Sequence, residues 1–204
     1  MTGHLAELLE NLEGLVAPPG FAEHYVRRLP DGELLQLDPI QRAEQVAAHL
    51  RLGAVRRPGE TKVEVLLPGD DHPGESILLL IVTDDRPFLV DTVSMDITRS
   101  GWNIRGLVHP QYEVRRDADG VLQAVAGNGT PGLAESWICV EVFPPLGRAA
   151  DTLAPELRDA VVKGVAAVEL AVDDGHPMER RLTETIDWLN EHPQPVSPHE
   201  VRSG

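Results

Sequence analysis

Two adjacent carboxylates, a guanidinium, a proline and an aromatic ring stand together at Asp84, Asp85, Arg86, Pro87 and Phe88. They follow a short apolar run and precede apolar residues at helical spacing. An aspartate followed by a proline is typical of a capped helix start, and we take this to be their main role. A second role is also open, because the unpaired amides of a new helix can receive a small anion such as an amino-acid carboxylate. Asp84 or Asp85 would then pair with the amino group.

His109 is the histidine best placed for chemistry, because His109 and Pro110 interrupt a strand pattern. None of the eight histidines pairs with another histidine, a cysteine or a carboxylate at a compact metal-ligand spacing. We therefore predict a structural or interface role for His109 and Pro110. An enzyme that uses His109 with Asp84 or Asp85 remains an alternative, although no motif supports it.

Two further patterns resemble sites but have simpler interpretations. The glycines from Gly127 to Gly132 match a dinucleotide motif, yet a strand pattern follows them where a helix is required, and Pro131 removes one amide. We interpret this segment as a hairpin loop. Cys139 stands in the middle of a strand pattern, so we expect a buried structural cysteine and not a nucleophile. We predict no catalytic residue, cofactor or metal in this chain.

Composition restricts the partners. The chain has 204 residues, a net charge of −15 and 42% hydrophobic residues, but only 4% aromatic residues. Such acidity disfavours nucleic acid and anionic membrane surfaces as partners. The single cysteine excludes an internal disulfide, and the first residues lack the basic character of a signal peptide. We expect a cytoplasmic protein without a membrane partner.

Hydrophobic periodicity indicates which elements must position these residues. Helical spacing of apolar residues predicts helices over about 5–16, 40–52 and 89–100, and two more after Pro144-Pro145. Alternating or continuous apolar runs predict strands over about 63–67, 77–82, 104–114, 121–126 and 137–143. The run Ile77 to Val82 is apolar on both alternating sets, so we expect a central strand covered on both faces.

The mixture of hairpin-connected strands and helices predicts an α+β fold, with an antiparallel or mixed sheet and helices on one face. We divide the chain into four parts. Residues 1–57 form an N-terminal helical segment, and residues 58–147 form the α+β domain. Residues 148–192 form a further helical segment that packs on the sheet or follows it, and residues 193–204 form a disordered tail rich in proline.

Four blocks carry a resemblance to a known family. They are KVEVLLP, ILLLIVTDDRPFLVDTV, GLVHPQYEVRRDADG and ESWICVEV, all between Lys62 and Val142. They resemble the N-terminal region of the very large bacterial NAD-dependent glutamate dehydrogenases. The resemblance implies an ACT-type domain, a ferredoxin-like unit often used for amino-acid sensing or subunit contact. It also implies that hydride transfer with NAD belongs to a domain far downstream in the parent enzyme.

The same resemblance makes 83–88 the helix-starting loop of an ACT domain. ACT domains that bind amino acids usually have a glycine after the proline of this loop, whereas this chain has Phe88. We therefore expect a regulatory or assembly module that acts with the remainder of the same polypeptide in a homo-oligomer, with an amino-acid effector as a further option. The alternative is an interaction or oligomerisation domain without ligand, which would pair through a sheet edge near His109-Pro110 or through Val63 to Leu67.

Overall fold

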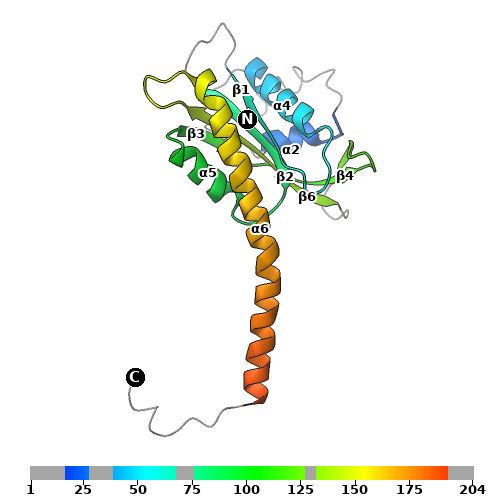
Figure 1. The fold of residues 1–204 in the computed structure, drawn as a ribbon. Coiled ribbons are helices and arrows are strands. Elements are labelled where there is room, and N and C mark those ends of the chain that lie inside the picture. The colour runs from blue at the N-terminus through cyan, green and yellow to red at the C-terminus, as the bar shows by residue number, and fades with distance from the viewer. Residues whose placement is uncertain (1–16, 28–38, 68–75, 127–131, 193–204) are drawn as a thin grey trace. The chain divides into compact units, whose positions relative to one another are not determined.

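The computed structural model describes residues 17–27, 39–67, 76–126 and 132–192. The predicted helix over 5–16, the connection 68–75, the glycine-rich loop up to residue 131 and the predicted disordered tail lie outside these ranges. Figure 1 shows the described elements in chain order. They are α2 (Phe21–Arg27), α4 (Pro39–Gly53), β1 (Lys62–Leu66), β2 (Ile77–Asp84), α5 (Leu89–Arg99), β3 (Asn103–Val108), β4 (Gln111–Arg116), β5 (Leu122–Ala126), β6 (Leu133–Phe143) and α6 (Ala150–Glu191).

The sheet is antiparallel throughout, in the order β1-β2-β6-β4-β5, and β3 also pairs with β6. Strand β6 is central to the sheet, because β2 lies along one side of β6 while β3 and β4 share the other side. β6 begins at Leu133, four residues before the predicted start at Trp137. The predicted α+β class is confirmed, with an antiparallel sheet.

The predicted strand over 104–114 is divided into β3 and β4 by His109 and Pro110. Proline has no amide hydrogen to give to the ladder, so it cannot continue a central strand. The carbonyl of Pro110 still takes part in hydrogen bonding with β6, because the backbone amide of Trp137 donates to its oxygen over 2.9 Å. A register shift between Ile104 and Gly106 adds the irregularity expected for this segment.

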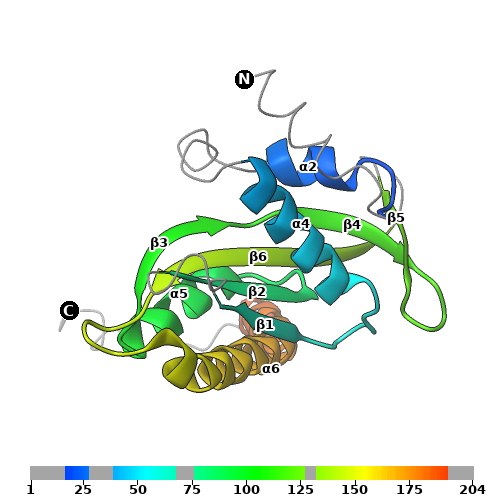
Figure 2. The ribbon, with the colours of Figure 1, turned by 90° about the horizontal axis from the view of Figure 1, so that it is seen from above.

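Helices cover both faces of the sheet, as Figure 2 shows, with α2 and α4 on one face and α5 and the first part of α6 on the other. The prediction that helices lie against one face only was therefore incomplete. On the α4 side, Leu80, Val82 and Trp137 join a core with residues of α2 and α4. Successive residues of a strand point to opposite faces, so buried Leu79 and Ile81 face α5 and α6. The prediction that this strand is covered on both faces is confirmed.

α5 and α6 lie on the second face. Leu89, Val93 and Ile97 of α5 are buried at the predicted spacing of four. Buried residues continue along α6 in a stripe that comprises Leu153, Leu157, Val161, Val165 and Val168. A side chain at Gly164 would meet the carboxylate of Asp96, which shows how closely α5 and α6 approach.

The two helices predicted after Pro144-Pro145 form one helix in the structure, Ala150–Glu191. A glycine and a proline lie between their two apolar stripes, and these residues weaken a helix without always ending it. Residues after Val168 form a second compact unit. Within that unit the predicted stripe residues Leu182, Ile186 and Leu189 are exposed.

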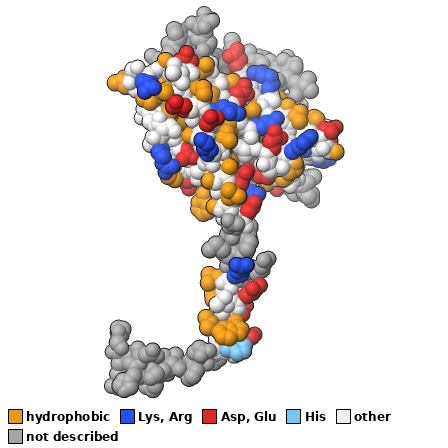
Figure 3. All heavy atoms as spheres, viewed as in Figure 1, with side chains coloured by type: hydrophobic (Ala, Val, Ile, Leu, Met, Phe, Trp, Pro, Cys, Tyr) orange, Lys and Arg blue, Asp and Glu red, His pale blue; other side chains and the backbone are white. Residues whose placement is uncertain are grey.

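Charge is distributed without a dominant patch on the face drawn in Figure 3, where acidic, basic and apolar side chains alternate over the larger unit. Among the described residues, no helix is long and apolar enough to cross a membrane.

Candidate functional site: the loop after strand β2

The loop between β2 and α5 contains all five residues predicted as a ligand loop. Asp84 ends β2, and Phe88 is the N-cap residue of α5. The prediction that an aspartate caps this helix is wrong, because no side chain bonds to the α5 amides at the N-cap. Asp84 and Asp85 make other contacts at the end of β2, which are described below.

Phe88 has a left-handed backbone, with φ at 68°, and the residue is 69% exposed. Among the described residues it is the single non-glycine residue with positive φ. A side chain in this region collides with its own backbone, which costs on the order of 1–2 kcal/mol. This is the position at which the family resemblance led us to expect glycine. The structure keeps the glycine-like backbone there and adds an exposed aromatic ring.

The carboxylate of Asp84 is bound on both oxygens. Oδ1 accepts from Nη2 of Arg56 over 2.6 Å, and Oδ2 accepts from the backbone amide of Gly59 over 3.0 Å. Arg56 and Gly59 lie in the connection between α4 and β1. Asp84 therefore attaches the start of the loop to the N-terminal part of the chain.

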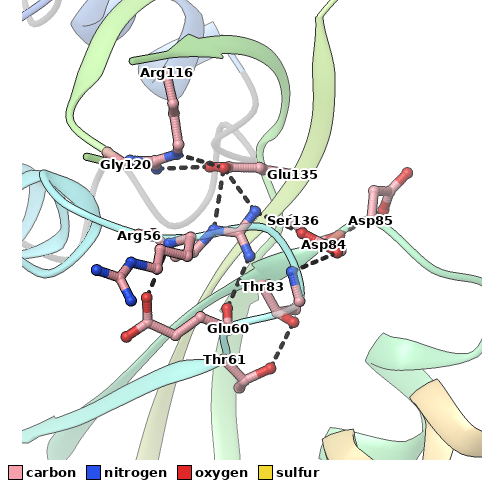
Figure 4. A network of polar contacts seen from close by, with 12 residues as sticks. Arg56, Glu60, Thr61, Thr83, Asp84, Asp85, Arg116, Gly120, Glu135 and Ser136 are labelled. Carbon is pink, nitrogen blue, oxygen red and sulfur yellow. Dashed lines mark hydrogen bonds and ion pairs between the residues drawn. The ribbon is translucent and has the colours of Figure 1, made fainter. Parts of the chain in front are cut away.

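Arg56 belongs to a buried ionic network around Glu135, which Figure 4 shows in detail. Glu135 is fully buried, and its Oε1 accepts from Arg56 Nη2 over 2.7 Å and from Arg116 Nε over 2.7 Å. Its Oε2 accepts from Arg116 Nη2 over 2.9 Å and from the indole of Trp137 over 3.1 Å. With Asp84 included, the two guanidinium cations meet two carboxylates, so the network is neutral. A buried charge is tolerated only with such compensation.

Sequence reasoning missed this network. Its members are far apart in the chain, and salt-bridge partners of this kind leave no spacing motif. One signal was available: Glu135 lies in strand phase with Trp137 and Cys139, where a buried residue is expected. A carboxylate at such a position must have cationic or donor partners.

Asp85 and His109 are linked through the hydroxyl group of Ser136. Asp85 Oδ1 accepts a hydrogen bond of 2.5 Å from the hydroxyl of Ser136, and His109 Nε2 lies 2.8 Å from the same hydroxyl oxygen. Gln111 donates to both oxygens of Asp85 over 3.1 Å. The alternative of an enzyme built on His109 therefore has the right neighbours.

The direction of these bonds differs from that of a catalytic relay. The proton of Ser136 points to Asp85, so His109 Nε2 donates to the serine instead of accepting from it. A nucleophilic serine needs the opposite arrangement, with its proton given to the histidine. Ser136 is also fully buried, out of reach of a substrate. The geometry favours the predicted structural role of His109, in which it links β4 and β6 to the loop.

The remaining predicted residues vary in exposure. Arg86 is partly buried and has interactions of its own, and Pro87 is exposed. Pro110 is buried. Among the residues that the structure describes, no three histidine, cysteine or acidic side chains are grouped as a metal site would require.

A second polar cluster lies under α4 and involves Cys139. Gln45 donates to the Cys139 sulfur, and Arg42 donates to Gln45 over 2.7 Å. Burial raises the pKa of the Cys139 thiol to about 12, so the thiolate needed for nucleophilic attack is rare at neutral pH. The prediction of a buried cysteine is confirmed by its 2% exposure.

His49 and Tyr25 complete this cluster. Tyr25 lies 2.9 Å from Nδ1 of His49, whose Nε2 lies 3.1 Å from the carbonyl oxygen of Ile81. Because a carbonyl only accepts, Nε2 carries the proton and Nδ1 accepts from the tyrosine hydroxyl. Burial lowers the pKa of His49 to about 4, although the bond to the Ile81 carbonyl acts in the opposite direction. Burial also raises the pKa of Tyr25 well above its usual value.

The fold and the loop together define an ACT-like α+β domain, in which the strand-to-helix loop after β2 is anchored by ionic and polar contacts. The family described as "Glutamate dehydrogenase, ACT1 domain" matches residues 21–157. This match covers more than half of the chain, from α2 into α6. The chain belongs to this family, which confirms the resemblance drawn from the sequence.

Three curated relatives agree, each named NAD-specific glutamate dehydrogenase. The chain is 30% identical to that of Pseudomonas aeruginosa over 125 residues, which covers 60% of this chain and 8% of the relative. It is 29% identical to that of Halomonas elongata over 152 residues, with 71% and 9% covered. It is 28% identical to that of Mycobacterium tuberculosis over 142 residues, with 68% and 8% covered. The chain thus spans less than a tenth of the length of these relatives.

Proposed function

We propose that this chain is a regulatory and assembly module of a large NAD-dependent glutamate dehydrogenase. The parent enzyme would oxidatively deaminate L-glutamate to 2-oxoglutarate, with NAD bound by the remainder of the same polypeptide. Membership of the ACT1 family and the similarity to three NAD-specific enzymes support the assignment of the parent. In this proposal the module itself supplies no catalytic residue.

One observation supports assembly as the main role and amino-acid sensing as the secondary role. Asp84 and Asp85 are the acids that could receive the amino group of an effector, and both already have partners within the domain. Asp84 is bound to Arg56 and Gly59. Asp85 is bound to Ser136 and Gln111. An effector would have to displace these bonds, whereas an assembly role requires only that they hold the loop in place.

Sensing of an amino acid has separate support. The N-cap of α5 has no side-chain bond, so its first amides are not taken by an aspartate, contrary to what the sequence led us to expect. Helix amides of this kind favour a carboxylate. Phe88 acts against such binding, because its side chain stands where close approach of a ligand to the backbone would need glycine.

Isothermal titration with glutamate, aspartate and arginine tests the sensing role on the 204-residue chain and on its Phe88→Gly variant. We expect no saturable heat from the unmodified chain. Saturable binding of any of the three to the unmodified chain would contradict the order proposed here. Binding that appears only in Phe88→Gly would identify the phenylalanine as the obstacle. If neither protein gives saturable heat, the sensing role is excluded and only the assembly role remains.

The alternative, an interaction domain without ligand, is favoured by the state of the sheet edges. The guanidinium of Arg158 donates to the Val63 carbonyl over 3.1 Å, so α6 partly covers the outer side of β1. Among the described strands, β3 pairs with β6 alone, which leaves its other side without a strand partner. Exposed edges of this kind accept another strand.

Hydrogen exchange at several protein concentrations tests assembly through this edge, together with the mass in solution. If copies pair through β3, the amides of Asn103–Val108 gain protection as concentration rises and the mass increases, while the amides of β1 and β5 serve as internal controls. A monomer at the highest concentration, with unchanged protection of β3, would contradict pairing of copies through this edge.

A further inference from the structure

The layer formed by α2 and α4 is joined to the sheet by hydrogen bonds whose acceptors are uncharged. At the C-terminal end of α4, the Arg116 guanidinium of β4 donates to the Gly53 carbonyl over 2.8 Å. Four other side-chain hydrogen bonds cross between the described residues of the layer and the sheet, and each has a neutral acceptor, either a backbone carbonyl or a thiol. They are His24 to the Gln111 carbonyl, Gln45 to the Cys139 sulfur, His49 to the Ile81 carbonyl, and the Tyr112 hydroxyl to the Phe21 carbonyl. Apolar packing around Trp137 supplies the rest of the contact. Figure 2 shows this layer on its own side of the sheet.

The chain that follows α4 is held much more firmly. The amide of Arg56 donates to the Gly120 carbonyl, and the amide of Leu122 donates to the Ala54 carbonyl, each over 2.9 Å. Val55 and Val121 form an isolated bridge between these two bonds. The guanidinium of Arg56 then enters the buried network around Glu135. The C-terminal end of the layer is therefore fixed to the β4–β5 hairpin, at a point where a hinge could form.

His49 lies at the centre of the contact between layer and sheet. It is fully buried. The centroid of its ring lies 5.6 Å from the ring centroid of Tyr25 on α2 and 5.2 Å from that of Trp137 on β6. Both ring nitrogens are used, by the Tyr25 hydroxyl and the Ile81 carbonyl. A proton added at Nδ1 removes the acceptor of the tyrosine hydroxyl and places a cation in this apolar surrounding.

No described acid in contact with His49 would compensate that cation. The titratable or charged groups of the cluster are Tyr25 on α2, Arg42 on α4, Tyr112 on β4 and Cys139 on β6. Tyr25 and Cys139 stay neutral because burial raises the pKa of each, and Arg42 is itself a cation. Glu141, further along β6, is bonded to Ser76 and Arg105.

We propose that the layer of α2 and α4 is a releasable cover over one face of the sheet, hinged at Arg56 and opened when His49 takes a proton. Opening would expose the face that contains Trp137 and Cys139, while α5 and α6 stay on the other face. Solvation of the imidazolium drives the opening, since the cation gains in water the hydration that the closed contact denies it.

Cys139 reports on this opening directly. It is the single cysteine of the chain, it is 2% exposed, and Gln45 of α4 covers it. Its labelling by dithiodipyridine, a thiol reagent that also works in mild acid, requires the cover to lift. A matched control places the thiol one residue away on the opposite face, as Val140→Cys with Cys139→Ser, because Val140 is equally buried under the other layer.

The expected result is a rise in Cys139 labelling, relative to the control cysteine, of up to about tenfold for each unit of pH lowered from about 6.5 to about 5. His49→Gln keeps a donor for the Ile81 carbonyl but cannot take the proton, so the rise should disappear in that variant. Three results would overturn the proposal: an equal rise at both cysteines, which reports global unfolding; no relative rise at Cys139; or a rise that persists in His49→Gln. None of these results bears on the family or on assembly through β3.

Discussion

Phe88 shows at the scale of a residue how an ACT-like loop can keep its shape without glycine. Its backbone is left-handed and its ring is mostly in solvent, so the ring recovers little of the conformational cost by burial. Neighbouring bonds at Asp84 and Asp85 hold the loop in this conformation.

Phe88→Gly should therefore raise the free energy of unfolding by on the order of 1 kcal/mol, because glycine adopts positive φ without strain. Urea denaturation followed by circular dichroism measures the change. Phe88→Ala is the control, since it removes the ring but keeps the strained backbone, and it should shift stability by less than about 0.5 kcal/mol. A glycine variant no more stable than the alanine variant would contradict this account.

Glu135 is the residue on which the buried ionic network depends. Glu135→Gln leaves the shape of the side chain but removes the charge that Arg56 and Arg116 share, so we expect a loss of roughly 3–5 kcal/mol in unfolding free energy. The matched control is Glu141→Gln on the same strand, whose ion pair with Arg105 is partly exposed and should contribute no more than about 1 kcal/mol. Similar losses in the two variants would refute the special role of Glu135.

At the scale of elements, the end of α4 is positioned by close contact with β6. Gly53 lies against the ring of Trp137, and a methyl group at this residue would overlap that ring. The same contact region contains the Arg116 bond to the Gly53 carbonyl, over 2.8 Å. A glycine at the C-terminus of a helix is common for conformational reasons, but here the approach of the indole is what requires it.

Gly53→Ala should destabilise the domain by roughly 1–3 kcal/mol, because neither α4 nor the buried indole can move away easily. Gly164→Ala in α6 is the comparison, since the obstacle there is the flexible end of Asp96 and alanine favours a helix by about 1 kcal/mol. Thermal unfolding of both variants measures the difference. A Gly53→Ala protein as stable as the parent would mean that the contact with Trp137 is loose.

At the scale of the whole molecule, stability should depend on pH through His49. Its pKa is lowered in the folded state to about 4, so the unfolded chain binds the proton first. The stability that neutral His49 contributes is complete above pH 6.5 and is lost as pH falls toward 4. The full loss is about 3 kcal/mol, from the difference in pKa.

Urea denaturation at several pH values measures this loss as the difference between the parent chain and His49→Gln. The difference in unfolding free energy between the two proteins should stay constant above pH 6.5. Below pH 6.5 the parent chain should lose more stability than His49→Gln. Parallel curves across the acid range would show that His49 does not titrate on unfolding.

The sequence alone determined most of the elements and the family. A period of two in apolar residues marked β1, an unbroken apolar run marked β2, and a period near four marked α4 and α5, because the two periods follow directly from strand and helix geometry. Side-chain identity at positions 84–88 and 109–110 located the loop and the strand break. The DDRPF and VHP blocks also carried the resemblance that the family match confirms.

Tertiary structure alone decided the partners of these residues. Apolar periodicity indicates that a face is buried but not which element covers it, so the division of the helices, with α2 and α4 on one face and α5 and α6 on the other, was not predicted. Arg56, Arg116 and Glu135 are separated in the chain. Pairing of β4 with β6 brings Arg116 to Glu135, and the bridge between the segment after α4 and the β4–β5 hairpin brings Arg56 to both. Asp84 has its partners in the connection between α4 and β1, and Asp85 has its partners in β6 and β4. Charged residues that pair in the folded structure can lie far apart in the sequence, so sequence spacing does not reveal which of them pair.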